Sequence, residues 1–97
     1  MLSGKQKRFL RKEAHHLKPI FQIGKSGLHE TIYKEVADAL EARELIKINV
    51  LQNAVEDAEE AGALIAEKTQ AELVQVLGRI ITLYKRSENH PNLELPR

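Results

Sequence analysis

Two glycines that enclose a lysine and a serine, at positions 24 to 27, form the segment with the clearest potential for chemistry. Glycines let backbone N–H groups approach a phosphate closely, and Lys25 adds a mobile positive charge. A helix expected to follow would direct the positive end of its dipole toward the same place. The same residues also suit a plain strand-to-helix turn. Gly24, Lys25, Ser26 and Gly27 are therefore candidate phosphate ligands whose role depends on their context.

Two sharper interpretations of this turn fail on spacing. A P-loop would need a glycine five positions before Gly24, where Pro19 stands. A nucleophile elbow around Ser26 would need a glycine in place of Leu28. The sequence therefore supports neither nucleotide hydrolysis nor serine hydrolysis.

The charged residues are segregated along the chain, although the formal net charge is only +1. The segment from Lys5 to Lys18 holds six basic residues and one acidic residue, whereas Glu56 to Glu67 holds five acidic residues and no basic one. Clustered cations suit a phosphate backbone, although many charge runs are only solvated helix faces. The candidate phosphate-neutralising cations in the basic segment are Lys5, Arg8, Arg11, Lys12 and Lys18.

The other polar residues do not form a catalytic or metal-binding pattern. The chain has no cysteine, which excludes disulfides, thiolate zinc sites and a cysteine nucleophile. The histidines lack ligand spacing, and the adjacent His15 and His16 should point to different sides of a helix. The carboxylates from Glu56 to Glu60 are more typical of a solvated face than of an acid–base pair. We expect no enzyme activity, no metal and no cofactor.

Aromatic side chains that could stack on bases are few. The chain has two phenylalanines and two tyrosines. Phe21 and Tyr84 lie in apolar, strand-like runs and are expected in the core. Phe9, beside Arg8, is either an exposed stacking platform or a packing residue.

Hydrophobic periodicity predicts the elements that must position these residues. Apolar residues recur at helical spacing over 3–17, 28–43 and 53–68, the last with a capping-box pattern at Asn53 and Glu56. Apolar or alternating runs predict strands over 20–23, 45–51, 73–77 and 80–84, the last two joined by a two-residue turn at Gly78-Arg79. The predicted fold class is α/β: a single layered domain, with an N-terminal helix, then β-α-β-α-β-β and a mixed four-stranded sheet.

Length and hydropathy bound the organisation of the chain. With 97 residues it has room for one compact domain, which we assign to 1–86, and the tail at 87–97 is expected to be mobile. No apolar run approaches the ~20 residues that cross a bilayer, and Lys5, Lys7 and Arg8 occupy the place of a signal peptide's apolar stretch. We expect a cytoplasmic protein that does not bind membranes.

Three segments resemble the CRM domain, named for chloroplast RNA splicing and ribosome maturation. They are Leu17-Lys18-Pro19, the run from Gln22 to Leu28, and Leu83-Tyr84-Lys85-Arg86. The likeness covers nearly the whole chain, whose length resembles that of the stand-alone bacterial members, the YhbY type, associated with precursors of the large ribosomal subunit. One departure is His29, where the family often has Ser or Thr, and Ser26 is expected to take over capping of the next helix.

The resemblance implies an RNA-binding domain similar in fold to the C-terminal domain of translation initiation factor three, with the G-x-x-G loop at the RNA. It predicts a ribosome-assembly factor that binds ribosomal RNA of the large-subunit precursor, with ribosomal proteins as further partners. We expect the protein to be a monomer. Lys85 and Arg86 are expected to extend the contact made by the loop and the basic segment. The alternative is a protein-interaction module that docks on a ribosomal protein or an assembly GTPase through the acidic third helix.

Overall fold

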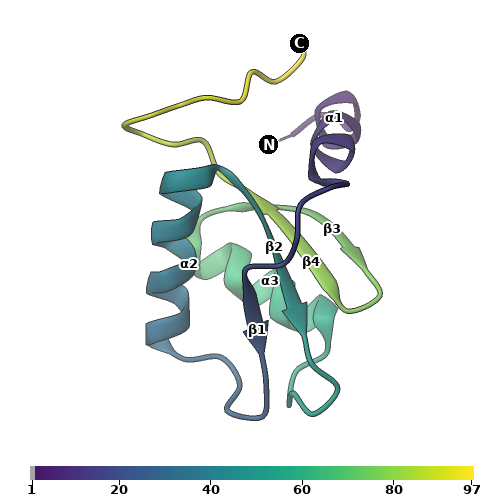
Figure 1. Cartoon of the computed structure of the whole chain (residues 1–97), viewed down its shortest axis with the longest axis vertical. Coiled ribbons are helices and arrows are strands. Elements are labelled where there is room, and N and C mark those ends of the chain that lie inside the picture. The colour runs from purple at the N-terminus through teal and green to yellow at the C-terminus, as the bar shows by residue number, and fades with distance from the viewer. Residues whose placement is uncertain (1) are drawn as a thin grey trace.

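The computed structural model describes residues 2–97, in which three helices alternate with four strands (Figure 1). The helices are α1 (Gly4–Ala14), α2 (Glu30–Arg43) and α3 (Ala58–Thr69). The strands are β1 (Phe21–Ile23), β2 (Leu45–Val50), β3 (Glu72–Leu77) and β4 (Ile80–Tyr84). The element order is the predicted one, an N-terminal helix followed by β-α-β-α-β-β. Across residues 2–97, no helix combines the length and apolar character that a membrane crossing requires.

The strands form one mixed sheet in the spatial order β1-β2-β4-β3. β1 runs parallel to β2, whereas β4 is antiparallel to both β2 and β3. Gly78 begins the turn between β3 and β4 with φ at +60°, a conformation that favours glycine at the first corner of a two-residue hairpin. The predicted mixed four-stranded sheet is confirmed.

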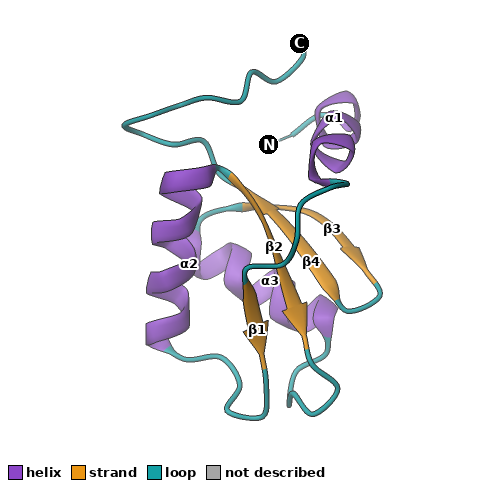
Figure 2. Cartoon of the chain, in the orientation of Figure 1, coloured by secondary structure: helices purple, strands orange, loops and turns teal. Residues whose placement is uncertain are grey.

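Helices α2 and α3 cover one face of this sheet (Figure 2). Their apolar stripes meet Ile46 and Ile48 of β2 and Ile81 of β4 in the larger hydrophobic core. At Gly62 of α3 an added Cβ would lie 3.1 Å from Leu73 Cδ1, so α3 approaches the sheet closely because this residue has no side chain.

Helix α1 packs on the opposite face of the sheet. Its buried residues Leu10 and Ala14 form a second core with Leu45, Val74 and Tyr84. Alternate strand residues point to opposite faces, which is why Leu45 lies under α1 while Ile46 belongs to the other core. The helix ends at Ala14, three residues before the predicted end.

Helix α3 begins at Ala58, later than predicted. Its N-cap is Asp57, whose Oδ1 accepts a hydrogen bond from the Glu60 N–H at 2.8 Å, and the Glu60 carboxylate accepts from the Asp57 N–H at 3.4 Å. The capping box predicted at Asn53 and Glu56 is wrong. The pair that caps the helix, Asp57 and Glu60, lies four residues after the predicted pair. The segment 51–57 is therefore a loop.

The residues after β4 are held by two carboxylates at the end of α2. Glu41 accepts hydrogen bonds from the Ser87 hydroxyl and from the N–H groups of Glu88 and Asn89. The buried Glu44 accepts from three further backbone N–H groups, those of Ser87, Asn92 and Leu93. These contacts fix the direction in which the chain leaves β4.

Farther along, the tail reaches α1. Leu93 and Leu95 pack against the second core, and Gln6 Nε2 donates a hydrogen bond to the Pro96 carbonyl oxygen at 3.0 Å. The expected mobility of 87–97 stays a prediction, and these contacts weigh against it.

Candidate nucleic-acid interface

The G-x-x-G segment forms a tight turn directly after β1. The Gly27 N–H donates a hydrogen bond to the Gly24 carbonyl at 3.0 Å, which leaves Lys25 and Ser26 exposed at the two corners. Gly27 is buried and has φ at +70°, where a side chain would be strained. The turn therefore presents one cation, one hydroxyl and its outer backbone to solvent.

Two residues separate this turn from helix α2, which is capped by His29 rather than by Ser26. The His29 Nδ1 accepts a hydrogen bond from the Ile32 N–H at 3.3 Å. The expectation that Ser26 caps the helix is wrong, because the imidazole itself supplies the acceptor. Ser26 is thereby left free at the corner of the turn.

The loop 51–57 lies beside the G-x-x-G turn. The Leu51 N–H donates to the Ile23 carbonyl at 2.9 Å, and an added Cβ at Gly27 would be 3.5 Å from Glu56 Oε1. That oxygen is buried and has no hydrogen-bond partner among residues 2–97. A carboxylate thus lies against the turn, where it opposes the approach of an anion. The sequence placed Glu56 on the third helix and did not reveal this contact.

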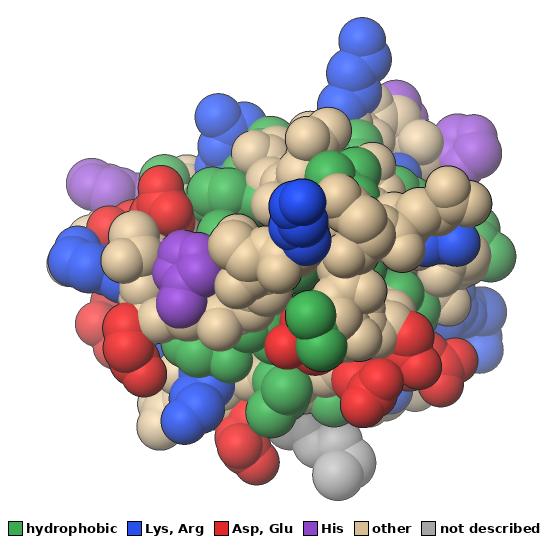
Figure 3. Space-filling model, turned by 90° about the horizontal axis from the view of Figure 1, so that it is seen from below, with side chains coloured by type: hydrophobic (Ala, Val, Ile, Leu, Met, Phe, Trp, Pro, Cys, Tyr) green, Lys and Arg blue, Asp and Glu red, His purple; other side chains and the backbone are tan. Residues whose placement is uncertain are grey.

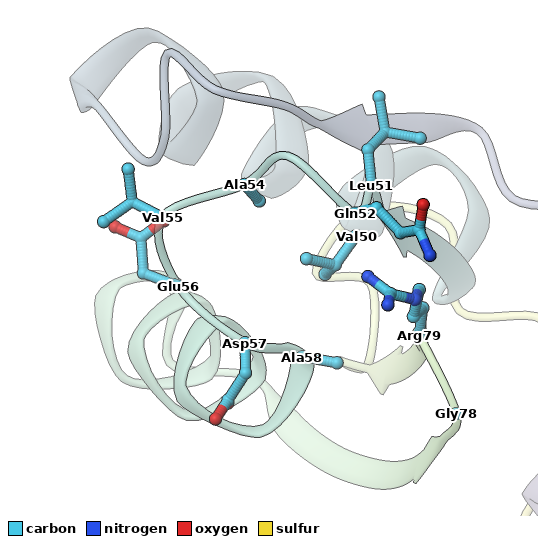
Figure 4. A pocket seen from close by; sticks show the side chains of 10 residues that line it. All are labelled: Val50, Leu51, Gln52, Ala54, Val55, Glu56, Asp57, Ala58, Gly78 and Arg79. Atoms are coloured by element: carbon cyan, nitrogen blue, oxygen red, sulfur yellow. The ribbon is translucent and has the colours of Figure 1, made fainter.

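The loop 51–57 and the hairpin turn enclose a hollow of about 450 Å³ at the same end of the sheet (Figure 4). Arg79 is exposed and directs its guanidinium into this hollow. Sequence reasoning treated Arg79 only as a turn residue. The signal that could have found it is topological, because a hairpin antiparallel to β2 must turn at the end where the loops after β1 and β2 lie.

Acidic and basic side chains are mixed at this end of the molecule. Figure 3, which views the protein from the end that carries these loops, shows Lys and Arg, Asp and Glu, and His side chains around the surface. Lys25 and Arg79 are accompanied by Glu56 and Asp57 on the neighbouring loop. The loop end is therefore not a continuous basic patch.

The basic residues of α1 lie toward the other end of the longest axis, which measures 39 Å (Figure 1). Leu10 and Ala14 are buried, whereas four cations of the helix face solvent: Lys5, Arg8, Arg11 and Lys12. Lys18 is exposed in the segment that leads from α1 to β1. The helix and the G-x-x-G turn cannot hold the same phosphate, so a ligand that contacts both must extend along the molecule.

The sheet face that carries α1 connects these two ends. Lys47 and Asn49 share this face with Leu45 but lie nearer the G-x-x-G turn, and Gln22 is the neighbour of Asn49 in the sheet. Gln22 is exposed, and Lys47 and Asn49 are half-buried. The alternation of β2 contained the signal for Lys47, which sequence reasoning did not select.

Lys85 and Arg86 differ in their surroundings. Lys85 is half-buried, and its Nζ donates a hydrogen bond to the Thr69 carbonyl at 3.0 Å, at the end of α3. Arg86 is exposed. Lys85 thus has a structural contact beside α3, on the face away from α1, and a role for either residue in ligand binding stays a prediction.

The four aromatic side chains take part in packing. Phe9, Phe21 and Tyr33 are half-buried, and Tyr84 is buried at 5% exposure. Phe9 packs against the second core, so it is a packing residue rather than a free platform. Contacts to a polymer would depend on charged and hydrogen-bonding groups.

Comparison with known proteins shows the family to which this chain is related. Residues 2–85 match the model of the family described as the CRS1 / YhbY (CRM) domain. A Bacillus subtilis protein named "Probable RNA-binding protein YqeI" is 52% identical over 96 residues, which cover 99% of this chain and 100% of that protein. A Haemophilus influenzae protein named "RNA-binding protein" is 41% identical over 99% of this chain and 96% of its own length.

The fold has a solved counterpart. The solution structure of a hypothetical protein from Staphylococcus aureus superimposes with a TM-score of 0.81 at 51% identity, covering 99% of this chain and 100% of that one. Sheet order, helix placement and G-x-x-G turn together define a small α/β domain of the CRM type. The chain belongs to the CRS1/YhbY (CRM) domain family, as the sequence resemblance predicted.

Proposed function

We propose that this protein binds RNA, that its ligand is ribosomal RNA in the precursor of the large ribosomal subunit, and that it acts there as an assembly factor. The observation that carries the proposal is the division of α1 into a buried stripe and an exposed cationic side. Lys5, Arg8, Arg11 and Lys12 face solvent and are not needed to fill either core. The names of the relatives, which describe RNA-binding proteins, support the same ligand class.

The geometry favours contacts to the RNA backbone. Exposed lysines and arginines neutralise phosphates and release counterions, and such contacts orient a nucleic acid without reading its sequence. Single-stranded RNA is commonly held by bases stacked on aromatic rings. All four aromatic residues here are packed, so the ligand that fits best is folded RNA recognised by its shape. The protein binds without a chemical step.

Crosslinking in cells tests the proposal. RNA crosslinked to the full chain is sequenced, and we expect enrichment of precursor RNA of the large ribosomal subunit. The variant in which Arg8, Arg11 and Lys12 are replaced by Gln should give fewer crosslinks to the same RNA. Crosslinks spread evenly over cellular RNA would contradict the ribosomal ligand, and the absence of crosslinks above background would contradict RNA binding.

The cellular setting follows from the same proposal. Assembly of bacterial ribosomal subunits takes place in the cytoplasm, where we place the protein as a monomer. Fractionation with sucrose gradients should find it with particles that contain the large-subunit precursor.

A further inference from the structure

A second hollow, of about 520 Å³, lies between the last turn of α1 and β3. Its lining residues are Arg11, Lys12, His15, His16 and Gln75. We call it the α1–β3 hollow. It is separate from the G-x-x-G turn, and within the described chain no acidic residue lines it.

An irregularity in β3 brings Gln75 into this hollow. Leu73 pairs with Leu83 and Gln75 pairs with Thr82, so Val74 is an extra residue between two consecutive pairs. The consequence is that Val74 and Gln75 both face α1: Val74 is buried beneath the helix, and Gln75 lines the hollow. Such bulges re-aim side chains and are frequent beside functional sites. In a regular strand these two residues would point to opposite faces of the sheet.

The end of α1 brings the two histidines together. His15 is the C-cap, and the helix does not continue through His16. Adjacent residues inside a helix diverge, yet both histidines are among the residues that line the hollow beside the end of this helix. Arg11 and Lys12, one turn earlier, complete the basic lining.

A purely structural role would explain only part of this arrangement. Basic residues in the last turn interact favourably with the negative end of the helix dipole, which suffices for Arg11 and Lys12. It does not explain an amide re-aimed by a bulge, nor an exposed hollow lined by two further histidines.

We propose that the α1–β3 hollow holds one phosphodiester of RNA and the adjoining ribose. This inference rests on the proposed RNA-binding function and adds contacts to it. The basic side chains bind the phosphodiester. The carboxamide of Gln75 both donates and accepts hydrogen bonds, as does a ribose 2′-hydroxyl, the group that distinguishes RNA from DNA.

The test compares Gln75→Leu with the wild-type chain on two ligands. One is a twelve-base-pair RNA duplex, and the other is its 2′-fluoro counterpart, which keeps the A-form but lacks the hydroxyl donor. We expect Gln75→Leu to weaken binding of the RNA duplex about two- to tenfold, the range for one hydrogen bond, and to leave binding of the 2′-fluoro duplex unchanged. Equal effects on both duplexes, or none on either, would overturn the ribose contact.

A second set of measurements tests the contact between the basic side chains and the phosphodiester. Replacement of His15 and His16 together by Gln should weaken binding of the RNA duplex, whereas the control with Lys34→Gln and Lys68→Gln, on the other helices, should not. In spectra of ¹⁵N-labelled wild-type protein, the Gln75 side-chain amide should shift with RNA. If it shifts with a polyglutamate peptide and not with RNA, the hollow is a protein-docking site and the inference is wrong.

Failure of this inference differs from failure of the proposed function. If the wild-type chain binds neither duplex, RNA binding itself is contradicted. If it binds, and Lys25→Gln weakens binding while the hollow variants do not, RNA binding stands and the hollow has no part in it.

Discussion

Opposite charges meet at the G-x-x-G turn. Lys25 is exposed at its corner, while the Glu56 carboxylate lies behind Gly27, with Oε1 buried and without a hydrogen-bond partner in the described part of the chain. A phosphate that approached the turn would gain from Lys25 and from outward N–H groups, and would be opposed by Glu56. The balance between these residues sets how strongly the turn can hold an anion.

Removal of the opposing charge should strengthen RNA binding. We expect Glu56→Gln to raise the affinity for RNA about three- to tenfold at low salt, because repulsion of a nearby phosphate is lost. Folding stability should hold or rise, since a buried carboxylate oxygen without a partner is costly. Glu59→Gln, on the exposed side of α3, is the matched control and should change the affinity little. An unchanged affinity for Glu56→Gln would show that no phosphate comes near this turn.

An added charge at the corner should have the reverse effect. Ser26 is exposed and caps no helix, so we expect Ser26→Asp to change stability by less than about 0.5 kcal/mol in thermal melts. RNA binding should fall, because the carboxylate would lie where we place a phosphate, whereas Ser26→Asn should bind like the parent. Equal affinities of the Asp and Asn variants at low salt would mean that this segment is only a turn.

Among the elements, α1 makes the largest contribution of exposed cations. Its apolar residues Leu10 and Ala14 fix it to the sheet, and the tail packs against it through Leu93 and Leu95. A polar helix of eleven residues would be marginal alone, so these contacts determine whether its cations have a defined arrangement.

The cations of α1 can be removed without loss of the fold. Replacement of Arg8, Arg11 and Lys12 together by Gln should weaken RNA binding at least tenfold at physiological salt, since each phosphate contact contributes to affinity. The thermal midpoint should fall only slightly, because these side chains avoid the core. Normal binding by the folded triple variant would show that this side of α1 is only solvated.

Glu41 and Glu44, the two carboxylates that hold the tail at the end of α2, form a clamp. We expect the attachment of the tail to depend on pH. The Ser87 hydroxyl, followed by the N–H groups of Glu88 and Asn89, lowers the pKa of Glu41 from 4.5 to about 2. For Glu44, burial raises the pKa, but hydrogen bonds from Leu93, Ser87 and Asn92 outweigh it and the net pKa is lowered.

Because both pKa values are depressed on folding, the stabilisation is complete above the ordinary value of 4.5 and is lost as the pH falls through the lowered pKa values, of which that of Glu41 is about 2. Amide signals of Glu88 and Asn89, followed by NMR, should therefore stay constant down to about pH 4.5 and change below it. A transition centred at the ordinary value would contradict the clamp and favour the mobile tail expected from the sequence.

Local sequence patterns were sufficient to predict most helices and strands. They were insufficient at the start of α3, where two capping patterns compete. Alternation identified β2 and its two faces, and Gly78-Arg79 identified the hairpin. The start of α3 was misplaced because Asn53 and Glu56 show the same capping spacing as Asp57 and Glu60, and the capping box forms at the second pair.

The candidate site was predictable in composition but not in layout. The segregated cations of α1 and the G-x-x-G turn were visible in the sequence. Glu56, Arg79 and Gln75 were not, because their positions depend on a loop contact, on strand pairing and on a bulge. The distance between α1 and the G-x-x-G turn was not predictable either, because it follows from the sheet, which places them toward opposite ends of the molecule.

For the whole molecule, this layout implies a ligand that spans much of the 39 Å axis. Exposed cations lie on α1, at Lys18 and at Lys25, and the half-buried Lys47 lies between them along the sheet. An extended array of separate phosphate contacts makes affinity depend on counterion release rather than on one tightly fitted pocket.

The central claim is that the protein binds RNA through contacts to the phosphate backbone of the RNA. The measurement that tests it most directly is a salt titration of the affinity for folded RNA. About five phosphate contacts predict a slope of roughly −3.5 to −4.5 in a plot of log K against log salt, and thus a loss of roughly 100- to 500-fold between 50 and 200 mM. The variant in which Arg8, Arg11 and Lys12 are replaced by Gln should show a slope of log K against log salt that is shallower by about two to three units. An affinity independent of salt, or the same slope in the variant, would contradict the account.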